Sequence, residues 1–172
     1  MASMPPITGI RLGISNAGSA GTIFGAGHES ITLDFRDGTS MVLEAGPDGP
    51  MGTGNLVETN YGGSLVSQLA VATSNINATG LALLNSYDNF AANTADTPVA
   101  YSPDNSDGFN SNAFISALWE SIGFSDEDID RMTSDVESAS HLSAVGSDTA
   151  TARGLAPEMN PINGSPGTRQ LY

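Results

Sequence analysis

The most regular hydrophobic pattern in the chain is a two-residue alternation on either side of a short break. Large apolar residues occupy every second position, at Ile31, Leu33 and Phe35 before the break and at Met41 and Leu43 after it. A period of two is the pattern of a strand with one buried face. The break itself, Arg36-Asp37-Gly38, ends in glycine. We therefore predict a β-hairpin over residues 28–45.

A three-residue loop with Gly38 in a left-handed conformation fixes the register of this hairpin. It pairs Phe35 with Thr39, Leu33 with Met41 and Ile31 with Leu43, and leaves Val42 as the one large apolar residue off the buried face. On the other face, Glu44 lies opposite Ser30 and diagonal to His28. Diagonal neighbours are about 7–8 Å apart, a separation that long side chains can close. The register therefore predicts a contact between His28 and Glu44.

Elsewhere the apolar spacing predicts mainly helices. Short strands are expected within residues 7–26 and at 55–58, and modest helices at 65–70 and 83–90, where apolar residues recur at helical spacing. The broadest apolar face lies at 111–122, a helix with Asn110 or Asn112 as its N-cap. Ser125 then caps a short acidic helix through Met132.

These elements predict an α+β fold. A small antiparallel sheet containing the hairpin packs against two or three helices, of which 111–122 is central. We expect a single α+β domain over residues 1–133. Residues 134–172 are rich in Ser, Gly, Pro and Asn and are expected to form an extended C-terminal segment, disordered or laid across the surface.

The charge balance narrows the choice of partners. Nineteen acidic residues face five arginines and no lysine, giving a net charge of −14. A nucleic-acid backbone or an anionic membrane would be repelled, so neither is expected as a partner. A basic protein is the partner that this charge favours, although good solubility explains the same charge.

The N-terminal residues lack the basic and apolar regions of a signal peptide, so localisation stays open between the cytoplasm and export without a cleaved leader. No cysteine is present. Catalysis would therefore have to use hydroxyl, carboxylate or imidazole groups.

Three such groups form a candidate constellation: Ser111 at a helix start, His28 at a strand start, and Glu44. A nucleophile at a helix N-terminus benefits from unpaired N–H groups and the helix dipole, and the N–H groups near Ser111 and Asn112 would bind an oxyanion. His28 would act as general base and Glu44 would orient it. Ordinary capping by Asn110-Ser111-Asn112 explains the same helix start without any chemistry.

The order of these residues resembles the circularly permuted branch of the papain-like NlpC/P60 superfamily. There a histidine opening a strand precedes an Asn-Cys-x-x-Phe motif that opens the nucleophile helix. Asn110, Asn112 and Phe114 fit this pattern, and Ser111 stands where cysteine is expected.

The resemblance implies a papain-like fold and hydrolysis of an amide or ester bond in a peptide or other acyl substrate, with Asn110 and Asn112 in the site. The chain also resembles uncharacterised proteins with an Asn-Ser-Asn-Ser-Phe type motif, some of which are found in toxin or effector settings, so an effector or secreted protein is expected. A serine is a weaker nucleophile than a thiolate, so the chain is expected to be either a serine variant or an inactive scaffold.

No metal or other cofactor is expected. The run Asp104-Asn105-Ser106-Asp107-Gly108 has calcium-type ligands but lacks EF-hand spacing, and a turn before a helix explains it better. His28 and His141 lie too far apart in sequence for a zinc motif, and no nucleotide-binding glycine fingerprint is present. Two non-enzymatic alternatives remain, an acidic interaction module and a structural component of a larger assembly.

Overall fold

A computed structural model of the chain describes residues 4–16, 26–50, 53–59, 64–103, 105, 108–147 and 149–161. The fold is α+β, as the sequence predicts. Its strands are β1 (Ile7–Asn16), β2 (Gly27–Phe35), β3 (Ser40–Leu43), β4 (Ala45–Pro47), β5 (Leu56–Glu58) and β6 (Leu65–Ala70). Its helices are α2 (Ile76–Thr94), α3 (Ser111–Ser121), α4 (Asp126–Ser140), α5 (Thr149–Ala152) and the 3-10 helix η2 (Ala156–Met159).

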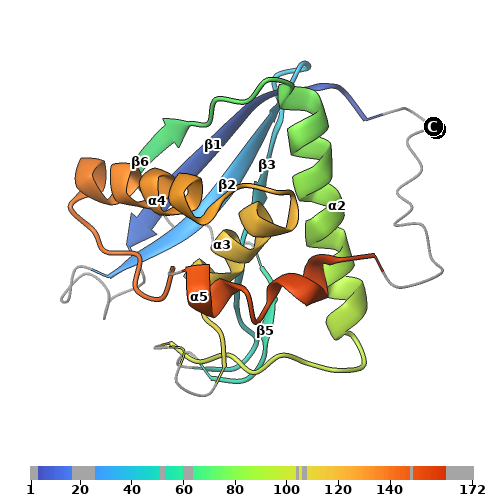
Figure 1. Cartoon of the computed structure of the whole chain (residues 1–172), viewed down its shortest axis with the longest axis vertical. Helices are drawn as coiled ribbons and strands as arrows, with labels where there is room; N and C mark the ends of the chain where they lie inside the picture. Colours follow the sequence, from blue (N-terminus) through green and yellow to red (C-terminus); the bar gives the residue numbers. More distant parts are fainter. Residues whose placement is uncertain are drawn as a thin grey trace.

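A four-stranded sheet in the order β3-β2-β1-β6 forms the centre of the molecule, and β4 and β5 form a separate two-stranded ribbon. Every neighbouring pair in the larger sheet is antiparallel. The helices lie over one face of this sheet (Figure 1). The alternating apolar residues of β1 and β2 point to that face and are fully buried: Ile10, Leu12, Ile14, Ile31 and Leu33.

The hairpin prediction is confirmed in register and in turn geometry. Ile31 pairs with Leu43 and Leu33 with Met41. Phe35 donates its N–H to the carbonyl of Thr39, and Gly38 has the left-handed φ of +85° that a side chain would disfavour. The alternation and the turn residue therefore determine this part of the fold locally.

The helix predicted over residues 65–70 is wrong, because this segment is strand β6. Leu65, Val66, Leu69 and Ala70 fit one helical face, but Leu69 also fits the inward face of a strand. β6 pairs with β1, with Leu69 opposite Leu12. Pairing with the longest strand of the sheet outweighs the weak helical pattern of so short a segment. In the predicted 7–26 region, β1 is one long strand, and residues 17–25 lie outside the described part.

Helix α3 has clear signals at both ends. Asn110 is the N-cap, and its side chain accepts hydrogen bonds from the backbone N–H groups of Asn112 and Ala113. At the C-terminal end Gly123 has φ +92° and donates to the carbonyl of Glu120, while Phe124 donates to that of Trp119. This pair of bonds is a Schellman motif, which ends a helix sharply. Both ends therefore follow from the sequence.

The acidic helix extends past its predicted end at Met132. Helix α4 begins after the predicted N-cap Ser125 but continues to Ser140, and Val136 is fully buried. The described residues after 134 differ from the extended segment that we expected, because α5 and η2 follow and bury Leu155 and Met159. Scattered apolar residues among many small polar ones were enough to fix this segment to the core.

Candidate functional site

His28 and Glu44 form a buried pair at one end of the sheet. The His28 Nε2 atom lies 3.0 Å from Glu44 Oε2, and both side chains are almost fully buried. Strand alternation turns the two side chains to the sheet face opposite Ile31. The predicted diagonal contact is therefore present, and the carboxylate fixes the orientation of the imidazole ring.

The backbone of Glu44 is itself held from two directions. Its carbonyl accepts a hydrogen bond from the Tyr87 hydroxyl at 3.0 Å and one from the Thr59 N–H at 3.1 Å. Desolvation raises the pKa of the Tyr87 hydroxyl, so it remains a donor throughout the physiological range. Helix α2 and the segment after β5 thus position the carboxylate that contacts His28.

Asn112 completes the open edge of β2 beside His28. Strand β3 pairs with β2 only as far as Ile31, so the backbone before it needs another partner. Asn112 Oδ1 accepts from the N–H of Glu29 at 2.9 Å, and its Nδ2 donates to the carbonyl of Gly27 at 3.0 Å. The Asn112 carboxamide therefore bonds to the β2 backbone at the residues before and after His28, as the peptide group of a neighbouring strand would.

Asn110 joins the same helix start to two loops. Its Nδ2 donates to the carbonyls of Pro103 and Val145, at 3.0 and 2.8 Å. Asn112 Nδ2 also donates to Val145. The polar atoms of both predicted binding residues are thus used inside the protein, which indicates a positioning role.

One predicted oxyanion donor is occupied. The Asn112 N–H points at Asn110 Oδ1, at 3.0 Å, so it cannot also face a substrate. The Ser111 N–H is the remaining donor of the pair that the sequence suggested.

Ser111 is the first residue of α3 and is buried. The next residue, Asn112, bonds to the backbone on both sides of His28, so the start of α3 lies against the start of β2. Within the described residues no hydrogen bond joins Ser111 to His28, whereas His28 and Glu44 are in direct contact. Catalytic hydrogen bonds are often loose before substrate binds.

Glu29 is a charged residue that the sequence reasoning missed. It is fully buried, and within the described residues neither carboxyl oxygen lies at hydrogen-bond distance from a partner. Burial raises its pKa to about 8; the nearby Thr133 side chain acts in the opposite direction, and the negative charge of Glu137 adds a smaller increase. Strand parity could have revealed it, because Glu29 shares the inward face of Ile31 and therefore points at α4.

No family model, curated protein or solved structure matches this chain. Among the residues that the structure describes, no three His, Asp or Glu side chains gather as a metal site would require. Most of the candidate calcium run, at positions 104, 106 and 107, lies outside that part of the chain. The helices of the described ranges include none that is long and apolar enough to cross a membrane.

Proposed function

We propose that the chain is a papain-like hydrolase of the permuted NlpC/P60 type, acting on an amide or ester bond with a serine nucleophile. The observation that supports it best is the buried His28–Glu44 pair, 3.0 Å apart, next to a helix start held by Asn112. A base, its orienting carboxylate and a hydroxyl at a helix N-terminus are the three parts that acyl transfer needs.

The contact between Glu44 and Nε2 supports one order of proton transfers. With a proton on Nε2 donated to the Glu44 carboxylate, the lone pair of the imidazole lies on Nδ1. In this scheme the His28 imidazole takes the proton from Ser111 Oγ as the oxygen attacks the acyl carbon. The resulting imidazolium, stabilised by Glu44, returns that proton to the leaving amine or alcohol. Water then hydrolyses the acyl-enzyme by the same steps, and the free acid is released.

The start of α3 supplies the stabilisation of negative charge. The oxygen of the tetrahedral intermediate would accept a hydrogen bond from the Ser111 N–H, close to the positive end of the helix dipole. Asn110 and Asn112 hold this end of the helix in place through their bonds to the neighbouring loops and to β2.

The test is covalent labelling of the purified protein with a fluorophosphonate, which reacts only with activated serines. We expect one label per chain, located at Ser111 by peptide mass spectrometry. Labelling should be abolished in Ser111→Ala and reduced by about two orders of magnitude or more in His28→Ala, because the base is lost. Ser134→Ala, an exposed serine on α4, is the matched control and should label like the wild type.

A second variant distinguishes two explanations for an unlabelled wild type: an unreactive serine at a correctly assigned site, or a wrongly assigned site. Ser111→Cys restores the nucleophile expected from the resemblance, and its thiolate is favoured by a nearby histidine and helix terminus. Fast alkylation of this cysteine by iodoacetamide, slowed by His28→Ala, would locate a working base even if the serine is unreactive. A cysteine that reacts no faster than free cysteine, together with an unlabelled wild type, would overturn the proposal.

A further inference from the structure

No described strand covers the outer edge of the sheet at β6. β6 is the terminal strand of the sheet and pairs with β1 alone among the described strands. Its six residues include no charge, proline or glycine, the features with which proteins usually protect sheet edges. Leu65 and Val66 are 42% and 47% exposed, although both are large and apolar.

The backbone of β6 offers hydrogen bonds outward. Val71, just past the strand, donates its N–H inward to Ile10 of β1. Because an antiparallel ladder alternates, the N–H and C=O groups of Ala70 and Gln68 face away from β1. An extended segment laid along this edge would find the hydrogen-bonding pattern of one more strand.

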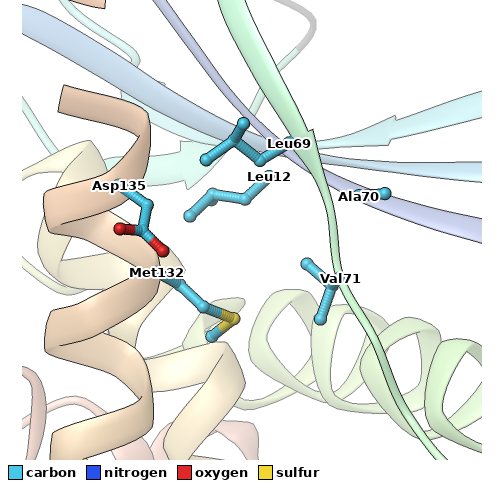
Figure 2. Close-up of a pocket in the computed structure, with 6 residues that line it drawn as sticks. All are labelled: Leu12, Leu69, Ala70, Val71, Met132 and Asp135. Carbon is cyan, nitrogen blue, oxygen red and sulfur yellow. The ribbon is translucent and has the colours of Figure 1, made fainter. Parts of the chain in front are cut away.

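A cavity of about 270 Å³ lies between β6 and α4, beside this edge. Leu12, Leu69 and Met132 point into it and Asp135 stands on its α4 side (Figure 2). The side chains of Leu12, Leu69 and Met132 line one part of it, which suits an aliphatic side chain of a partner strand. Asp135 is exposed and has no ion pair among the described residues, so it suits a cation beside that side chain.

The charge of the chain identifies the occupant. Against nineteen acids there is no lysine, and Arg11, Arg131 and Arg153 already pair with carboxylates. A second copy of the same chain would bring its own −14 charge and another Asp135 to the edge. The negative electrostatic potential of the chain attracts a basic segment, whereas it repels a second copy of the same acidic chain.

We propose that β6 is a docking edge for an extended basic segment of another protein, which adds a strand beside β6, inserts an aliphatic side chain between β6 and α4, and pairs a cation with Asp135. Strand addition of this kind draws affinity from backbone hydrogen bonds and specificity from alternate side chains. The docking edge lies across the sheet from β3 and the His28–Glu44 pair, and it is independent of the hydrolase proposal.

The test uses a short fluorescein-labelled peptide in which arginine and valine alternate, titrated with the protein and followed by fluorescence anisotropy. We expect saturable binding. Asp135→Asn should weaken it about threefold to fivefold, the effect of one partly exposed ion pair. Asp130→Asn changes the net charge equally on the same helix but lies away from the cavity, so it should leave affinity within about twofold of the wild type.

A backbone variant tests strand addition itself. Ala70→Pro removes an outward N–H without breaking a bond to β1, and proline is tolerated on edge strands. It should abolish saturable binding while circular dichroism and the unfolding temperature confirm an intact fold. If Ala70→Pro fails to fold, Asp135→Asn and the two comparison peptides below still decide the proposal.

Two comparison peptides separate specific docking from simple charge attraction. The first has the same composition but groups its arginines and valines apart, and the second alternates glutamate with valine. Both should bind at least about tenfold more weakly, since one lacks the alternation and the other the charge. Equal binding of all three peptides would overturn the proposal. So would a dimer in analytical ultracentrifugation that Ala70→Pro dissociates, because β6 would then join two copies of this chain.

Discussion

Glu29 is a single buried residue that should make the stability of the fold depend on pH. Its carboxyl group lies on the inward face of β2, near Thr133 and Glu137 of α4, and neither oxygen is at hydrogen-bond distance from a partner in the described part of the chain. The protonated form is favoured there, because a buried charge without a partner is costly. Glu29 directly follows His28 in β2, so this buried carboxyl lies on the strand that carries the candidate base.

The stability of the protein should therefore fall as the pH rises from about 4.5 to about 8, the ordinary and the raised pKa of Glu29. In this window the folded state binds more protons than the unfolded state, so each step up in pH favours unfolding. Glu29→Gln mimics the protonated acid and should remove a loss on the order of a few kcal/mol between pH 5 and 9.

Urea unfolding at the two pH values measures this difference. Glu127→Gln, an exposed carboxyl in the first turn of α4, is the control and should keep the wild-type difference. An unchanged pH dependence in Glu29→Gln would show that other groups control it.

Asn112 carries a second residue-scale prediction. Asn112→Ala removes three hydrogen bonds and leaves the Glu29 N–H and the Gly27 carbonyl without partners. We expect a loss of about 2–4 kcal/mol in the free energy of unfolding. Asn93→Ala, which breaks two bonds to the carbonyls of Glu158 and Asn160 near the surface, should cost clearly less. Equal losses would mean that the edge of β2 needs no substitute partner.

At the scale of elements, local signals decide which predictions succeed. The hairpin and both ends of α3 depend on neighbours within a few residues, and each follows from the sequence. β6 does not, because its apolar spacing fits a helix and a strand equally and only the partner β1 decides. The length of α4 was missed for a related reason, since its second half is held by packing of Val136 rather than by strong helix formers.

In the candidate site, too, contacts between nearby strand positions could be predicted and contacts between distant positions could not. The His28–Glu44 contact follows from strand register alone and could be predicted. The bonds of Asn112 to β2 join positions more than eighty residues apart, and no local pattern contains them. The sequence predicts these asparagines as binding residues, and in the structure their side chains join the helix start to β2 and to two loops.

The end of α3 can be tested directly. An added Cβ at Gly123 meets no atom within 4 Å, so Gly123→Ala changes only the cost of its φ of +92°. We expect a loss of about 1–2 kcal/mol in the free energy of unfolding. Gly123→Asn should lose less, because asparagine tolerates the left-handed conformation. Thermal unfolding of the two variants side by side measures the difference, and equal losses would argue against a conformational cause.

At the scale of the whole molecule, residues 149–161 pack onto the core. Leu155 is fully buried, and η2 packs against both α2 and α3. Leu155→Ala should cost about 2–5 kcal/mol, as buried leucines do. Val145→Ala is the control, since Val145 is 51% exposed and its loss should stay within about 0.5 kcal/mol. A small effect at Leu155 would mean that the fold stands without this region.

Trp119 gives the protein a built-in optical reporter. It is the single tryptophan of the chain, it lies on α3 with only 1% exposure, and its ring is 4.9 Å from that of Phe124. Its emission should therefore be blue-shifted in the native state and should move to longer wavelength when α3 leaves the core. Intrinsic fluorescence thus follows the helix that carries Ser111, whereas a peptide bound at β6 should leave the emission wavelength unchanged.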